Sequence, residues 1–292
     1  MTQLVKVGTL AVIGVGLIGG SFALALRKAG VVDRVLGVGR KPQTLARARE
    51  LGIIDAAVTA REAAEQADLI MVAAPVCAFE SVFRELAEHL TDKVILTDGG
   101  STKGNVVAAA RSSLGNRIRQ FVPAHPMAGS HLSGPEAAYP DLYRQKNVIL
   151  CPLEENPASA VQFVHDAWQA CGARLHRMAF EQHDEVVAAI SHLPHWLASL
   201  YVLQVARDRN ADMDFKMAGA GFADFSRIAQ GSEEMWRDIF SANRDAMLRQ
   251  IDSLHGLLDE ARRALEAKDF QWIEQMLSES AERRRRWEQE RS

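Results

Sequence analysis

A glycine-rich turn close to the amino terminus constrains the fold of this chain more than any other feature. The apolar run at residues 10–14 leads into Gly-Val-Gly-Leu-Ile-Gly at residues 14–19, and an amphipathic stretch follows. In a strand–turn–helix unit, Gly14 permits the tight turn, Gly16 lets the backbone approach a pyrophosphate, and Gly19 lets the helix pack closely on the strand. The first N–H groups of the helix are free to bind phosphate oxygens. The pattern therefore predicts a dinucleotide-binding site.

Short apolar runs alternate with amphipathic stretches along the first half of the chain. The runs lack in–out alternation, which is typical of strands covered on both faces. They cover residues 10–14, 35–39, 69–73, 94–98, 121–124 and 147–151, with a further run at 173–178. Helical stretches lie between them at residues 17–29, 44–51, 60–67, 79–90 and 158–171. This alternation predicts an α/β fold with a Rossmann-type doubly wound, mostly parallel sheet.

The second half of the chain has a different pattern. Beyond about residue 180 the strand signals stop, and helical patterns cover residues 181–209, 233–268 and 272–291 around a glycine-bearing break at 219–231. The length of 292 residues suits two domains, since a domain typically has about 100–200 residues. We expect a dinucleotide-binding domain at residues 1–179 and an all-α domain at residues 180–292.

The composition argues against several classes of partner. Lys and Arg number 34 and Asp and Glu 37, and this near-neutral balance does not favour nucleic acid. Residues 1–14 lack the order of a signal peptide, and no stretch approaches the roughly 18 uncharged apolar residues of a membrane span. Three cysteines without metal-binding spacing suit a reducing compartment. We expect a cytoplasmic protein that binds neither nucleic acid nor a membrane.

The end of the second predicted strand indicates which dinucleotide binds. An NAD site places Asp or Glu there for the ribose 2′-hydroxyl, whereas this chain has Arg40 and Lys41. A guanidinium can bind a 2′-phosphate through charge-assisted hydrogen bonds. The sequence therefore favours NADP, and the alternative, if Arg40 only faces solvent, is an enzyme that accepts either NADP or NAD. The predicted cofactor contacts are Gly14, Gly16, Leu17, Ile18, Gly19, Arg40, Lys41, Thr44, Ala74 and Pro75.

Three polar clusters carry the candidate chemical residues, at residues 97–104, 124–130 and 183–195. Ligands of open α/β sheets bind at the carboxyl ends of the strands, so the first two clusters can face a nicotinamide. Taken alone, His125 also suits a loop histidine bonded to backbone. His192 and His195 share a helix face, but no Cys or helical Glu accompanies them, so we expect no metal site.

Five segments together resemble one enzyme family. GVGLIGGS, DGGSTKG, AHPMAGS, the QHD…SHLPH stretch and GFADFSRIA occur in the order of the prephenate and arogenate dehydrogenases of tyrosine biosynthesis. The resemblance covers about residues 9–275, and the combination of the later segments is specific to this family. It implies oxidation of the ring C4 hydroxyl of prephenate or arogenate, with loss of the C1 carboxylate as CO2. The products are 4-hydroxyphenylpyruvate and tyrosine, respectively.

The resemblance also implies roles for individual residues. His125 matches the catalytic histidine, a general base that hydrogen-bonds the C4 hydroxyl, and Ser101 matches a serine that shares this hydroxyl. Arg227 matches the arginine that binds a substrate carboxylate. The remaining positions implied at the substrate site are His183, His195, Asp224, Trp236, Ser130 and His131. Many relatives have an acidic residue where His131 stands. The family's helical domain forms an intertwined dimer, which implies a homodimer.

Two alternative functions remain open on the sequence. A dehydrogenase of the β-hydroxyacid type shares the architecture but relies on a lysine of its helical domain, where this chain has the histidines of SHLPH. A non-catalytic NADP sensor would have no need of Ser101, His125 and Arg227 together. Within the resembling family, Arg40 is similar to the NADP-using, arogenate-active branch, which tilts the expected substrate towards arogenate.

Overall fold

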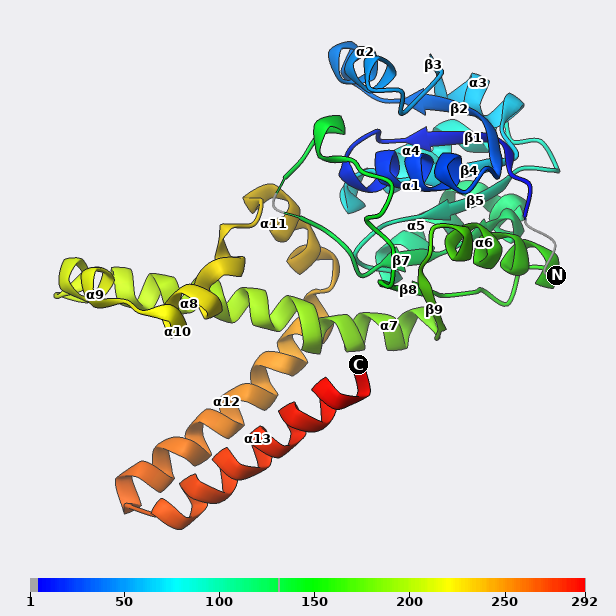
Figure 1. The fold of residues 1–292 in the computed structure, drawn as a ribbon. Coiled ribbons are helices and arrows are strands. Elements are labelled where there is room, and N and C mark those ends of the chain that lie inside the picture. Colours follow the sequence, from blue (N-terminus) through cyan, green and yellow to red (C-terminus); the bar gives the residue numbers. More distant parts are fainter. Residues whose placement is uncertain (1–4, 131, 292) are drawn as a thin grey trace. The chain divides into compact units, whose positions relative to one another are not determined.

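The computed structural model describes residues 5–130 and 132–291 of the chain (Figure 1). The chain divides into two compact units, one up to Arg244 and one from Asp245. The first unit carries the sheet and most of the helices. The part of the second unit that the structure describes, up to residue 291, consists of helices and the turn between them.

A six-stranded sheet forms the centre of the first unit. Its strands are β1 (Gly8–Ile13), β2 (Val32–Val38), β3 (Ala56–Ala57), β4 (Leu69–Val72), β5 (Ile95–Asp98) and β6 (Phe121–Val122). Their order is β3-β2-β1-β4-β5-β6, and every neighbouring pair is parallel. This is the strand order of a doubly wound dinucleotide-binding sheet, in which the direction of winding reverses between β1 and β4. The predicted fold class is confirmed, although the two-residue β3 was not expected.

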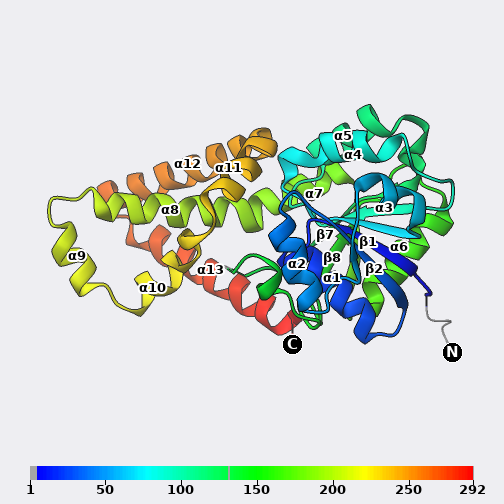
Figure 2. The ribbon, with the colours of Figure 1, turned by 90° about the horizontal axis from the view of Figure 1, so that it is seen from above.

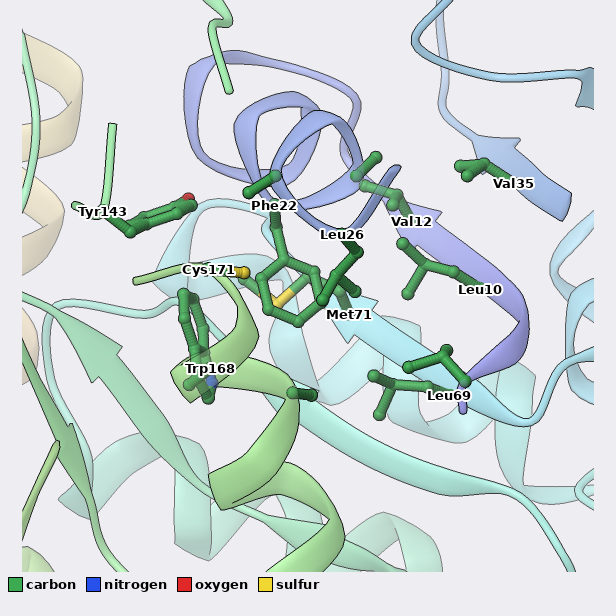
Figure 3. Close-up of a cluster of buried hydrophobic side chains, with 14 of the residues drawn as sticks. Leu10, Val12, Phe22, Leu26, Val35, Leu69, Met71, Tyr143, Trp168 and Cys171 are labelled. Atoms are coloured by element: carbon green, nitrogen blue, oxygen red, sulfur yellow. The ribbon is translucent and has the colours of Figure 1, made fainter. Parts of the chain in front are cut away.

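Helices cover both faces of this sheet, because successive residues of each strand point to opposite sides. They are α1 (Leu17–Lys28), α2 (Pro42–Glu50), α3 (Ala60–Gln66), α4 (Phe79–Ala87), α5 (Gly104–Leu114) and α6 (Ala158–Ala170). Leu10 and Val12 of β1 belong to the core under α1 and α6, where Phe22 packs on Trp168 with ring centroids 4.5 Å apart (Figure 3). Ala11 and Ile13 belong to the opposite core. Figure 2 shows α4 and α5 on one side of the sheet and α1 on the other.

A second, three-stranded sheet was not anticipated. It contains β7 (Ala124–Pro126), β8 (Asn147–Leu150) and β9 (Arg174–Arg177), with β7 antiparallel and β9 parallel to β8. The run predicted as one strand at residues 121–124 is divided at Pro123 between the two sheets. Proline has no N–H to continue the first ladder, and its carbonyl instead accepts a hydrogen bond from Cys151. The chain therefore leaves the parallel sheet two residues before His125.

The helical part of the first unit begins with α7 (Phe180–Val187) and continues through a π-helical turn at Ala188–His192 into α8 (Leu193–Ala206). Three shorter helices follow, α9 (Ala211–Met217), α10 (Ala220–Ser226) and α11 (Glu233–Ala242). The glycine-bearing break predicted at 219–231 therefore contains a short helix. The single helix predicted over 233–268 is interrupted at Asn243.

By length and composition alone, Phe180–Ala206 meets the requirement for a membrane span that we expected no segment to approach. It does so because the π-turn joins α7 and α8 into one run of 27 residues. Within the described residues it is the one helical run that passes this test. Only 28% of its most apolar window is buried, so much of its apolar surface is exposed in the single chain.

The second unit is a helical hairpin of α12 (Arg244–Ala267) and α13 (Phe270–Arg291) (Figure 1). Lys268 adopts a left-handed conformation in the turn, with φ 57°. The Asp269 carboxylate then accepts a hydrogen bond from the Trp272 N–H, which satisfies a free donor at the start of α13.

Candidate active site

The glycine-rich turn has the geometry that the sequence predicted for a pyrophosphate site. Gly14 has φ 91°, and a Cβ atom there would lie 2.5 Å from the carbonyl oxygen of Ala73. A Cβ on Gly19 would lie 2.4 Å from the carbonyl oxygen of Gly14. Gly16, by contrast, faces open space, and no side chain caps the N-terminus of α1 that it precedes. The turn thus leaves room and free N–H groups for a dinucleotide where the reversal of winding opens a crevice.

The carboxyl end of β2 carries the residues predicted to choose between NADP and NAD. Arg40 and Lys41 are exposed, and Thr44 in the first turn of α2 is half-buried. Among the described residues, neither cation has an ion-pair partner. Ala74 and Pro75 follow β4, and the Ala74 nitrogen lies 3.2 Å from the position of a Cβ on Gly14. The predicted cofactor contacts therefore follow the carboxyl ends of three neighbouring parallel strands, β1, β2 and β4.

A fully buried ion pair stands at the end of β5. One carboxylate oxygen of Asp98 accepts hydrogen bonds from Lys103 Nζ at 2.5 Å and from the Gly100 N–H at 2.8 Å. The other oxygen accepts one from the Ala124 N–H at 2.8 Å. Asp98 thus joins the loop that carries Ser101 to the first residue of β7, next to His125. Asp98 and Lys103 lie in the polar cluster predicted at residues 97–104, but neither was predicted as a site residue.

His125 belongs to a chain of three side chains. Its Nδ1 atom lies 2.8 Å from Nε2 of His183, and Nδ1 of His183 lies 2.8 Å from a carboxylate oxygen of Asp184. The two carboxylate oxygens of Asp184 also accept hydrogen bonds, each 2.8 Å long, from the Lys103 and Gly104 N–H groups at the start of α5. Helix α7 is therefore tied to both the loop after β5 and the histidine on β7. Asp184 was not predicted as a site residue, although it follows His183 directly.

Burial controls the charge of these groups. It is the main reason why the pKa of His125 lies well below its usual value, and the neighbouring His183, Lys103 and His192 lower it further. Burial also lowers the pKa of His183, despite the opposing effect of Asp184. The pKa of Asp184 is lowered: its burial acts against this, and hydrogen bonds from His183 and from two backbone N–H groups outweigh the burial. At neutral pH the chain consists of two neutral imidazoles and one carboxylate.

Two further histidines lie beside this chain. His195 stacks on Trp236 with ring centroids 3.6 Å apart, and the ring of His192 stands nearly perpendicular to the same indole. Burial lowers the pKa of both, that of His192 to about 4. A Cβ on Gly231 would lie 2.5 Å from Trp236 Nε1, so this glycine allows the stack to form. The structure therefore brings the predicted residues His195 and Trp236 together.

Other predicted residues lie apart from the His125 chain. Arg227 and Asp224 are exposed at the end of α10, and Ser130 is exposed and accepts a hydrogen bond from the Leu132 N–H at 3.0 Å. Among the described residues, no hydrogen bond or ion pair joins them to His125. His131 lies outside the described residues. Within the described part of the chain, no group of three or more His, Cys, Asp or Glu residues could hold a metal ion.

A doubly wound sheet with an open glycine-rich turn, and a buried histidine at the carboxyl edge, defines a nicotinamide-dependent oxidoreductase. Comparison with known families narrows this class. Residues 22–177 match the model of the prephenate dehydrogenase nucleotide-binding domain, and residues 179–279 match that of the prephenate dehydrogenase dimerization domain. The chain belongs to the prephenate dehydrogenase family, whose reaction is an oxidative decarboxylation.

Individual relatives agree with this assignment. The chain is 33% identical over 279 residues to cyclohexadienyl dehydrogenase of Zymomonas mobilis, which covers 94% of each protein. It is 36% identical to prephenate dehydrogenase of Bacillus subtilis, over 89% of this chain and 71% of that one. The structure of prephenate dehydrogenase from Aquifex aeolicus, in complex with hydroxyphenyl propionate and NAD+, superimposes with a TM-score of 0.90 at 32% identity. That comparison covers 97% of this chain and 99% of the other.

The family assignment decides between the functions that the sequence left open. It favours the prephenate and arogenate dehydrogenases over the β-hydroxyacid type and over a non-catalytic sensor. Arogenate dehydrogenase of Synechocystis shares the fold, with a TM-score of 0.83 at 24% identity.

Proposed function

We propose that the chain oxidises and decarboxylates arogenate, prephenate or both, with NADP favoured over NAD as hydride acceptor, and that His125 is the general base. The single observation that carries this proposal is the hydrogen-bonded chain from His125 through His183 to Asp184. This chain of side chains lies near the glycine-rich turn, because a Cβ on Gly99 would contact both Ile18 of that turn and Pro126 beside His125.

The hydrogen bonds determine which imidazole nitrogen can accept a proton. The carboxylate of Asp184 only accepts, so Nδ1 of His183 carries a proton and Nε2 of His183 carries a lone pair. This lone pair must accept from Nδ1 of His125, which leaves Nε2 of His125 unprotonated. Nε2 of His125 is thus the atom able to take the proton of the C4 hydroxyl. The imidazolium that forms is stabilised through His183 by the charge of Asp184.

Once His125 has taken the hydroxyl proton, the rest of the reaction needs few further protein groups. An oxidised nicotinamide bound there would supply the acceptor for the hydride of C4. Loss of CO2 produces an aromatic ring, so a base that is unprotonated at neutral pH and a fixed substrate orientation are the main requirements. We assign Ser101 to the same hydroxyl as His125. Arg227, whose guanidinium is exposed, is assigned to a substrate carboxylate, which a planar guanidinium binds through two hydrogen bonds.

The preference for NADP rests on the end of β2. Arg40 and Lys41 are exposed there, and residues 39–44 contain no carboxylate to repel a 2′-phosphate. An NAD-type site would instead offer Asp or Glu to the ribose hydroxyls.

The decisive experiment is a matrix of kcat/KM for prephenate and arogenate, each with NAD and NADP, followed by absorbance of the reduced cofactor. We expect turnover with at least one substrate and a higher kcat/KM with NADP. Absence of turnover with both substrates would refute the proposed reaction. Equal or higher kcat/KM with NAD would refute the cofactor preference alone. An Arg227→Ala variant should chiefly raise KM for the substrate.

A homodimer is the second part of the proposal. The apolar side chains exposed along the π-turn and α8–α10 are Ile190, Leu200, Tyr201, Leu203, Met213, Phe215, Met217 and Phe225. Exposed apolar surface of this kind marks a contact with another molecule, and the matching family model describes this region as a dimerization domain. We propose that a second copy covers it, in a cytoplasmic enzyme whose three cysteines stay unpaired. Light scattering should give twice the chain mass of 32.1 kDa, and the mass of a single chain would contradict the dimer.

A further inference from the structure

A buried asparagine, Asn243, separates α11 from α12 and contacts both Asp184 and His192 of the candidate site. Asn243 is 5% exposed, and its backbone, at φ −111° and ψ 32°, interrupts the helix that the sequence predicts there. Its side-chain Nδ2 donates to the backbone carbonyl of Asp184 at 2.8 Å. The same Nδ2 lies 3.2 Å from Nδ1 of His192.

These two contacts define the orientation of the amide and the tautomer of a histidine. A backbone carbonyl only accepts hydrogen bonds, so the nitrogen of the Asn243 amide, and not its oxygen, must face Asp184. The same nitrogen faces Nδ1 of His192, which must then offer a lone pair. The proton of His192 is consequently on Nε2. Because burial lowers the pKa of His192 to about 4, this neutral tautomer persists at neutral pH.

The contacts also lie where the helix changes its geometry. The carbonyl of Asp184 accepts from the Ala188 N–H as well as from Asn243, and Ala188 is the first residue of the π-turn. The next turn closes with the wider spacing, since the Leu193 N–H donates to the Ala188 carbonyl. Asn243 thus connects the residues on either side of the π-turn. Its side chain contacts Asp184, which precedes the turn and follows His183, and His192, which ends the turn.

We propose that Asn243 is a positioning residue, which holds His192 as the Nε2–H tautomer and keeps Asp184 aligned with His183 and His125. This inference rests on the proposed function, in which His125 is the base. Asn243 acts through its neighbours: Asp184 orients His183, which in turn orients His125.

The test compares Asn243→Ala and Asn243→Asp with a matched control. The control is Gln120→Ala, because Gln120 is also a 5% exposed amide whose nitrogen donates to two acceptors, the carbonyls of Thr91 and Val94. It lies at the end of the turn before β6 and contacts no histidine of the site. All variants are compared for kcat, for KM of substrate and cofactor, and for thermal unfolding.

The expected kinetic result is a loss in kcat with KM for the cofactor unchanged. Misalignment of a base by an ångström can cost about 10²-fold, so we expect Asn243→Ala to lower kcat by about 10- to 10²-fold. Gln120→Ala should lower the unfolding temperature and keep kcat. A folded Asn243→Ala variant with the kcat of the wild type, or an equal loss of kcat in Gln120→Ala, would overturn the proposal.

A second readout does not depend on turnover. In protein labelled with nitrogen-15 histidine, the His192 signals should show protonated Nε2 and unprotonated Nδ1. In Asn243→Asp the new carboxylate accepts from His192, so Nδ1 should become protonated. Unchanged His192 signals in Asn243→Asp would refute the role of Asn243, whatever the activity. Full turnover in His125→Asn would instead refute the proposed base. The His192 signals would still test whether Asn243 sets the tautomer of His192.

Discussion

The imidazole of His125 on β7 lies 2.8 Å from that of His183 on α7, although the two residues are 58 positions apart in the sequence. The contact is made possible by Pro123, where the chain leaves the parallel sheet and pairs with β8 instead. Asp184 then secures α7 to the start of α5. The proposed base is therefore held in place by three segments at the end of β5, namely β7, α7 and the start of α5.

Replacement of His125 tests the proposed base directly. His125→Asn keeps a polar side chain of smaller size but removes the atom that accepts the proton. We expect kcat to fall by about 10²–10⁴-fold, the contribution of a positioned general base, with little change in KM. Steady-state rates with the preferred substrate measure this. Near-normal turnover would remove His125 from the mechanism.

The acid limb of the pH profile should lie below pH 6.5, the usual pKa of a histidine. Burial and the neighbouring His183, Lys103 and His192 all lower the pKa of His125. The base works unprotonated, so kcat/KM rises as pH increases through this lowered pKa and is level at neutral pH. A pH series of kcat/KM measures the position of the limb. A limb centred at or above pH 6.5 would contradict the assigned environment of His125.

Asp184→Asn should disturb the proton positions along the chain of histidines. An amide at residue 184 can donate to Nδ1 of His183, which would reverse both tautomers and place a proton on Nε2 of His125. We expect kcat to fall by about 10²-fold or more, as wrong-tautomer substitutions do in other histidine chains. Asp55→Asn is the control, because Asp55 accepts from the Val35 N–H and pairs with Arg27 away from the site. Equal kcat in the two variants would count against the chain.

Removal of Lys103 from its buried pair with Asp98 should destabilise the fold strongly. Lys103→Met leaves the carboxylate of Asp98 buried without its cation, which typically costs about 3–5 kcal/mol of unfolding free energy. Arg117→Met, which removes the partner of the exposed Asp92, should cost only about 0–1 kcal/mol. Urea unfolding of both variants measures the difference. Similar losses of unfolding free energy in the two variants would contradict the expected cost of leaving Asp98 buried without its cation.

Arg40→Asp should invert the preference between NADP and NAD. The substitution replaces a cation suited to the 2′-phosphate by a carboxylate suited to the ribose hydroxyls. The measurement is the ratio of kcat/KM for the two cofactors. Arg34→Asp serves as control, since Arg34 lies on the same strand, β2, and its guanidinium contacts Gln66. If the ratio stays the same in Arg40→Asp, Arg40 does not select the cofactor.

Much of the architecture could be predicted from local patterns. The alternation of apolar runs and helices determined the sheet, and the spacing of three glycines determined the turn, because both depend on neighbouring residues. The division of residues 121–124 at Pro123 was missed, since an apolar run does not show which partner strand it pairs with. The π-turn was missed for a similar reason, because a 3.6-residue period conceals one inserted residue.

The site was predicted in part. His125 and His183 came from a family resemblance, and the structure brings them together. Asp98, Lys103, Asp184 and Asn243 were not singled out, because their importance lies in contacts across 5 to 81 positions of sequence. The acidic Asp98 and the basic Lys103, five positions apart in one predicted cluster, were the one signal in the sequence that could have suggested such a pair.

The π-turn at Ala188–His192 has a consequence for how this enzyme can change. Each residue of an α-helix advances the side-chain direction by about 100°, so deleting one residue from this turn would rotate the helix that follows it, α8, by that angle. His195 would leave the indole of Trp236, while His183 and Asp184, before the turn, would keep their places. The residues before the turn, His183 and Asp184, and the residue after it, His195, would then no longer face the same site, although the helix would remain intact. Substitutions in this helix can therefore change the site in small steps. Insertion or deletion of a single residue in the π-turn would instead misplace His195 completely.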